Sequence, residues 1–130
     1  MTWLHDHIWP TESTHIDYRF VEDGSRLAVA ELLQGGVTCF NDMYFFPEAV
    51  AAVAAETGIR ATVGMIVIDF PSAWANNADE YLQKGIDLHQ QLQSSALIST
   101  ILAPHAPYTV CDDTLNKVCL LYTSPSPRDS

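Results

Sequence analysis

The sequence has few basic residues. Only 6 of its 130 residues are lysine or arginine, against 16 aspartates and glutamates, and the formal net charge is −10. This is the wrong sign for a protein that binds the phosphate backbone of nucleic acids or an anionic membrane surface. We therefore expect neither a nucleic-acid partner nor a membrane partner.

Signals of export and of membrane insertion are also missing. No apolar run approaches the roughly 18 to 20 residues that span a bilayer, and the chain does not open on a basic segment followed by an apolar core. These features favour a cytoplasmic location. Cysteine is scarce, and Cys39, Cys111 and Cys119 form no Cys-x-x-Cys pair, so neither a disulfide framework nor a structural zinc site is expected. Cys39 lies in an apolar segment and is expected to be a buried thiol.

What is present is enough apolar mass for one domain, since 48% of the residues are hydrophobic and 17% are charged. Helical spacing of apolar residues covers 3–9 (ended by Pro10), 15–33, 47–57, 77–93 and a short helix from 112 to 118. Apolar segments typical of strands buried on both faces cover 37–41, 60–68 and 97–104. This alternation predicts an α/β fold with parallel strands and helical crossovers. Three strands do not distinguish a barrel from an open sheet. The sequence has no Gly-x-Gly-x-x-Gly turn and no phosphate loop, which weakens the case for a nucleotide-binding open sheet without excluding it.

Each predicted strand ends on polar side chains: Asn41 with Asp42, then Asp69, then His105. Ligand sites of parallel α/β proteins lie at the carboxyl ends of the strands, so these residues are expected to face one common site. His105 stands between Pro104 and Pro107, which fix the direction in which the chain leaves the strand. The alternative is a stiff exit turn with a solvated imidazole.

Three segments, residues 3–12, 35–44 and 103–110, together resemble the 5′-methylthioadenosine/S-adenosylhomocysteine deaminases of the metal-dependent amidohydrolase superfamily. The resemblance covers residues 1–118. It implies part of a (β/α)8 TIM barrel, with about three of the eight parallel strands and their helices. It also implies a hydrolytic deaminase, in which a metal-bound water attacks C6 of adenine and ammonia leaves. The alternatives are a related purine or pyrimidine deaminase or triazine chlorohydrolase, and a non-catalytic α/β binding module.

The resemblance also implies roles for two residues. Glu12 matches the carboxylate that holds the ribose hydroxyls of a nucleoside. His105 matches the histidine that hydrogen-bonds the purine, as a neutral imidazole that donates to a ring nitrogen. The family's zinc ligands and its acid/base glutamate lie outside the matched segments, so the chain is expected to be an internal fragment with no catalytic and no metal-binding residue. A small-molecule nucleoside is the expected partner, and a homo-oligomer is possible.

Two segments, at residues 5–7 and 119–130, do not follow the family pattern. His5-Asp6-His7 spells the His-x-His of amidohydrolase metal sites, but it lies in a helical pattern, where residues two apart point about 200° apart and do not share one ion. Residues 119–130 form a Pro/Ser-rich tail that departs from the family, and we expect it to be non-native or disordered.

Overall fold

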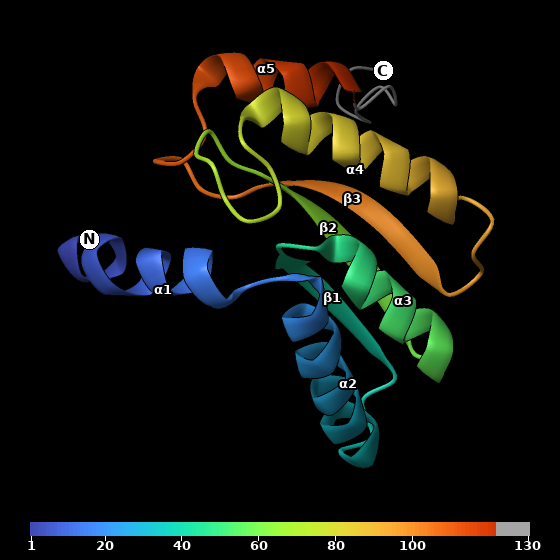
Figure 1. Ribbon diagram of the computed structural model, residues 1–130. Coiled ribbons are helices and arrows are strands. Elements are labelled where there is room, and N and C mark those ends of the chain that lie inside the picture. Colours follow the sequence, from blue (N-terminus) through green and yellow to red (C-terminus); the bar gives the residue numbers. More distant parts are fainter. Residues whose placement is uncertain (122–130) are drawn as a thin grey trace.

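Three parallel strands form the sheet around which the protein is built (Figure 1), and the computed structural model describes residues 1–121. The strands are β1 (Cys39–Tyr44), β2 (Arg60–Val67) and β3 (Ile98–Pro104), in the order β1-β2-β3. Met43 of β1 pairs with Gly64 of β2, which pairs with Ile101 of β3. The predicted α/β order with parallel strands is therefore confirmed.

Four helices connect and cover these strands: α2 (Tyr18–Gln34), α3 (Pro47–Thr57), α4 (Ala78–Leu92) and α5 (Asp112–Leu121). α3 and α4 pack against β2 and β3, α5 packs against β3, and α2 packs against α3. The core lies between the sheet and these helices, where Val53, Ile59 and Val63 are almost fully buried. No helix within residues 1–121 combines the length and the apolarity that a membrane crossing requires.

The helix ends follow from local chemistry. The Asp17 carboxylate accepts a hydrogen bond from the Phe20 amide at 2.7 Å and caps α2, and the Asn77 side chain does the same for α4 at the Glu80 amide, at 2.9 Å. Gly58 ends α3 with a left-handed φ of 75°. Gly58 directly follows the predicted helix 47–57, and Asn77 is the first residue of the predicted helix 77–93, so both boundaries agree with the structure.

The prediction that all three strands are buried on both faces is correct only for β2. Burial alternates along β1 and β3, and on the face away from the helices Met43 and Ile101 remain 39% and 37% exposed. β1 and β3 are the edges of the described sheet, and the helices cover only one of its faces. For the same reason Cys39, expected to be buried, is exposed.

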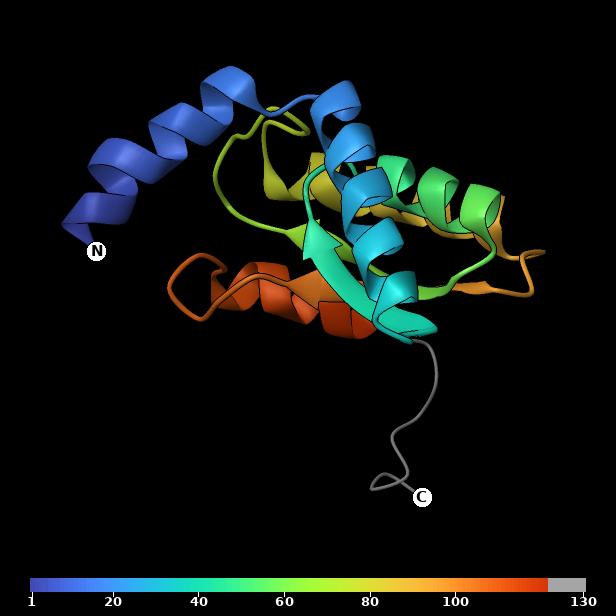
Figure 2. The ribbon, with the colours of Figure 1, turned by 90° about the horizontal axis from the view of Figure 1, so that it is seen from below.

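Pro10 does not end the first helix, contrary to expectation. A π-helical segment (Leu4–Ile8) runs directly into α1 (Trp9–His15), and Pro10 occupies the first turn of α1. Pro10 leaves one place in the hydrogen-bond ladder without an amide, and the helix passes this position as a π-helical segment that becomes α-helical. Figure 2 shows α1 extending away from the sheet.

The last helix is longer than predicted. α5 continues to Leu121, three residues beyond the expected boundary at residue 118. The rest of the predicted tail, residues 122–130, lies outside the described residues.

Candidate ligand-binding site

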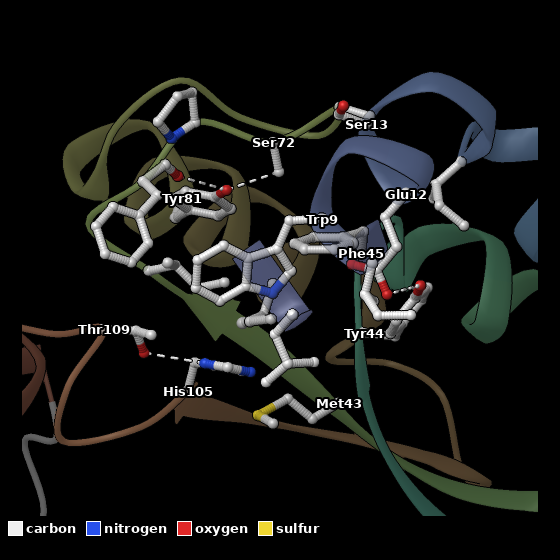
Figure 3. A pocket seen from close by; sticks show the side chains of 18 of the residues that line it. Trp9, Glu12, Ser13, Met43, Tyr44, Phe45, Ser72, Tyr81, His105 and Thr109 are labelled. Atoms are coloured by element: carbon white, nitrogen blue, oxygen red, sulfur yellow. Dashed lines mark hydrogen bonds between the residues drawn. The ribbon is translucent and has the colours of Figure 1, made fainter. Parts of the chain in front are cut away.

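A cavity of about 340 Å³ opens at the carboxyl ends of the strands (Figure 3). Its wall comes from three parts of the chain: α1, the strand ends, and the loop that follows β2. Glu12 and Trp9 face it from α1, Tyr44 from the end of β1, and His105 from the end of β3. The structure thus brings together the two residues that the resemblance assigned to substrate binding, although 93 positions separate them in the sequence (105 minus 12).

Glu12 reaches the cavity from the first turn of α1, and Tyr44 holds its carboxylate. The Tyr44 hydroxyl donates a hydrogen bond to Glu12 Oε1 at 3.1 Å, and both side chains are half-buried. Burial, followed by the negative charge of Glu12, raises the pKa of Tyr44 to about 12. The phenol is therefore a permanent donor at neutral pH, and the other carboxylate oxygen keeps its acceptor capacity.

His105 is fixed at the point where β3 ends. Its backbone amide donates to the Val67 carbonyl oxygen at 3.1 Å, which ties the turn to β2. On the ring, Nδ1 lies 2.9 Å from the Thr109 hydroxyl oxygen. The protein therefore fixes the His105 backbone through Val67 and its ring through Thr109, and the ring lines the cavity.

The loop after β2 forms the wall opposite His105, through Phe70 and Ser72 among others. The Tyr81 hydroxyl lies 2.9 Å from the Phe70 carbonyl oxygen and 2.6 Å from the Ser72 hydroxyl oxygen. Tyr81 belongs to α4 and is fully buried. The Trp74 indole N–H donates to the Glu48 carboxylate of α3 at 3.0 Å. The loop is therefore attached to two helices of the core.

Asp69 does not face the cavity as predicted. Its carboxylate accepts hydrogen bonds from the Cys111 amide at 2.5 Å and from the Thr114 hydroxyl at 2.7 Å, at the start of α5. The Thr114 bond, with those from Cys111, lowers the pKa of Asp69 below its usual value. Asp69 is therefore a helix-capping residue, and the strand-end pattern alone could not separate this use from ligand binding.

Asn41 and Asp42 also lie elsewhere, because β1 continues past them to Tyr44. They line a separate hollow of about 250 Å³ between α2 and β1. Burial raises the pKa of Asp42 there. The cavity residues missed from the sequence include Tyr44 at the end of β1 and Thr109 in the turn after β3, since a tyrosine or a threonine at such positions carries no distinctive pattern.

The described residues do not fit a metal site. Within residues 1–121 no three His, Cys, Asp or Glu side chains lie close enough together to hold one ion. His5 and His7 lie on the π-helical segment, as the helical pattern predicted, and the His5 ring packs 5.8 Å from that of Trp9. Residues 1–121 by themselves therefore form no such ligand group.

Comparison with known proteins defines the class. Residues 1–122 match the amidohydrolase family, and the chain belongs to it. The three strands and their helices are part of the TIM barrel of these enzymes. A solved adenosine deaminase from Xanthomonas campestris with bound zinc superimposes with a TM-score of 0.89 at 51% identity, covering 93% of this chain and 28% of that one.

The proteins most similar in sequence include several deaminases of one name. The chain is 48% identical to a 5-methylthioadenosine/S-adenosylhomocysteine deaminase of Saccharophagus degradans, over 93% of this chain and 27% of that protein. It is 49% identical to the deaminase of the same name from Thermodesulfovibrio yellowstonii, over 88% of this chain and 26% of that protein. The chain therefore spans about a quarter of the length of the relatives that it matches.

Proposed function

We propose that the complete protein is a hydrolytic deaminase of 5′-methylthioadenosine or S-adenosylhomocysteine, and that this chain supplies part of its substrate site. The observation that carries the proposal is the meeting of Glu12 and His105 in one cavity. The identity of about one residue in two with deaminases of that name supports it. The cavity volume is within the range of about 300 to 1,000 Å³ typical of small-molecule sites.

In this proposal Glu12 accepts hydrogen bonds from the ribose hydroxyls. A carboxylate suits two neighbouring hydroxyl donors, and the Tyr44 bond occupies only one of its oxygens. A carboxylate in this position is useful for a nucleoside and of no use for a free base. The assignment therefore favours a nucleoside deaminase over a related enzyme that acts on a base or a triazine.

His105 contacts the purine in this proposal. It lies at the end of a barrel strand, where TIM-barrel enzymes carry their substrate-contacting residues. Zinc is the metal proposed for the complete protein, on ligands outside residues 1–121. Homo-oligomer formation and a cytoplasmic location stay predictions.

A second candidate substrate is 5′-deoxyadenosine. The chain is 36% identical to a 5′-deoxyadenosine deaminase of Methanosphaera stadtmanae over 89% of its length. This substrate has the same ribose diol and the same adenine ring, so Glu12 and His105 would serve both substrates equally. The 5′ substituent is the part of the molecule that distinguishes them.

The test is to measure ammonia release by the complete, metal-loaded protein. We expect release from 5′-methylthioadenosine, S-adenosylhomocysteine or 5′-deoxyadenosine, and much slower release from free adenine. Release from free bases alone would contradict the nucleoside assignment, and release from no aminopurine would contradict the deaminase proposal.

A further inference from the structure

Thr109 is a polar residue with an unusual position. It is 3% exposed and lines the ligand cavity beside His105. Its hydroxyl oxygen lies 2.9 Å from His105 Nδ1 and 3.1 Å from the carbonyl oxygen of Ala106 (Figure 3 shows the first contact). One hydroxyl thus bridges a ring nitrogen and a backbone acceptor.

The single hydroxyl proton determines where the imidazole proton is. A carbonyl oxygen only accepts, so the contact with Ala106 is a hydrogen bond only if Thr109 donates to it. The hydroxyl oxygen is then an acceptor toward His105, and Nδ1 must carry a proton. This arrangement makes two hydrogen bonds. The reverse arrangement, with Thr109 donating to Nδ1, makes one and leaves two oxygens 3.1 Å apart with no proton between them.

The backbone around Thr109 keeps this arrangement in place. The Thr109 amide donates to the Ala106 carbonyl oxygen at 3.0 Å, and the Thr109 carbonyl oxygen accepts from the Asp69 amide at 3.0 Å. His105 is tied to Val67 at the same strand end. The hydroxyl and the imidazole therefore belong to one fixed turn that is attached to β2.

We propose that Thr109 is a positioning residue that fixes His105 as the Nδ1–H tautomer, so that Nε2 offers the ligand a hydrogen-bond acceptor. In a neutral imidazole the nitrogen without the proton is the acceptor. Figure 3 shows the side of the His105 ring away from Thr109 directed into the cavity. The matching ligand group is an N–H donor, such as the amino group of an adenine, and not the purine ring nitrogen to which the resemblance has His105 donate. That last step rests on the proposed function; the tautomer itself does not.

The tautomer is tested by nitrogen NMR. In the complete enzyme with ¹⁵N-labelled histidine, the chemical shifts of the two ring nitrogens identify which one is protonated, and His105→Gln assigns the signals. We expect the Nδ1–H form in the wild type, a change toward the Nε2–H form in Thr109→Val, and the Nδ1–H form again in Thr109→Ser. An Nε2–H wild type, or a Thr109→Val variant that keeps Nδ1–H, would overturn the proposal.

Thr114→Val is the matched control. Thr114 is the other buried threonine of this region, 4% exposed, and its hydroxyl bonds Asp69 instead of His105. The control should lower the thermal unfolding midpoint and leave the His105 tautomer unchanged. A tautomer change in Thr114→Val as large as in Thr109→Val would show a general disturbance of the turn and would contradict the specific role.

Kinetics then separate this inference from the proposed function. If His105 contacts the purine, Thr109→Val should raise KM for 5′-methylthioadenosine about 3- to 10-fold, the loss expected for one hydrogen bond, and Thr109→Ser should restore most of the affinity. A tautomer change with unchanged KM would uphold the role of Thr109 on His105 and contradict the purine contact.

Discussion

Glu12 shows how much of a residue's role depends on its partner. Its position in the sequence is an ordinary helical one, and only the Tyr44 hydroxyl, 32 residues away in sequence, marks its carboxylate as held over a cavity. The free oxygen of that carboxylate gives Glu12 its proposed contact with the ribose. Two predictions follow at this scale, one for each member of the pair.

Glu12→Gln in the complete enzyme should lower kcat/KM for 5′-methylthioadenosine by about 10-fold or more, because a hydrogen bond to a charged acceptor is replaced by a bond to a neutral one. The value for adenine, which has no ribose, should change little. Steady-state kinetics on both substrates measure the difference. Equal losses on the two would count against a ribose contact.

Tyr44→Phe should raise KM for the nucleoside about 3- to 10-fold with little change in kcat, because the carboxylate loses the hydroxyl that holds it. The ring should stay packed, since it contacts Phe45 at a centroid distance of 5.1 Å. Tyr18→Phe, which removes a hydroxyl from α2 outside the cavity, is the control. If the two variants behave alike, Tyr44 does not position Glu12.

At the scale of the helices and loops, the polar residues at strand ends divide between two uses. His105 faces the cavity, whereas Asp69 caps α5 and joins the end of β2 to the helix after β3. The loop after β2 is likewise attached to α3 and α4 through Trp74 and Tyr81. These contacts build the cavity wall, so their removal should affect stability first.

Asp69→Ala should lower the free energy of unfolding of the complete enzyme by about 1 kcal/mol, the usual contribution of a helix cap. The pKa of Asp69 is lowered by folding, so its stabilisation is present above the unfolded pKa of about 3.9 and is lost as the pH falls through the folded pKa. Denaturant unfolding at neutral pH and near pH 3 should show the difference between wild type and variant shrinking in acid. A difference that grows in acid would contradict the capping role.

Tyr81→Phe should destabilise the enzyme by about 1 kcal/mol, because the Phe70 carbonyl oxygen and the Ser72 hydroxyl lose their common partner. Thermal unfolding measures the loss, with Tyr18→Phe again as the control. The KM for the nucleoside should rise as well, since both partners lie in the cavity wall. An unchanged unfolding midpoint would show that the loop does not depend on Tyr81.

Local sequence patterns predicted the helices and strands well. The predictions that were wrong have physical causes. Residues whose effect is local, such as Gly58 at a helix end and Asn77 at a helix start, could be identified from sequence. The effect of Pro10 was misjudged because the preceding segment is π-helical and the helix continues through the proline. Asp69 was misjudged because its partners lie more than 40 residues away.

For the whole molecule, the sheet has two open edges and one uncovered face within residues 1–121. The outer edges of β1 and β3 have no neighbouring strand there. On the face away from the helices, Met43 of β1 and Ile101 of β3 are exposed. Open parallel edges are a poor basis for a stable monomer. The chain matches about a quarter of its relatives' length, which is consistent with a barrel completed by other segments.

Residues 1–130 expressed alone should therefore be poorly folded, bind no stoichiometric zinc and release no ammonia from 5′-methylthioadenosine. Thermal unfolding, dialysis against limiting zinc with metal analysis, and an ammonia assay test the three parts. One tightly bound zinc per chain that disappears when His5 and His7 are changed to alanine would overturn the fragment interpretation and the assignment of that motif together.

The attachment of α1 has a consequence for how such enzymes diverge. Glu12 is carried by a helix that extends away from the sheet, whereas His105 directly follows strand β3. In the proposed function, the sugar contact and the base contact therefore lie on separate parts of the chain. We expect that exchange of residues 4–15, which carry Glu12, changes the sugar preference and leaves the base contact at His105 in place.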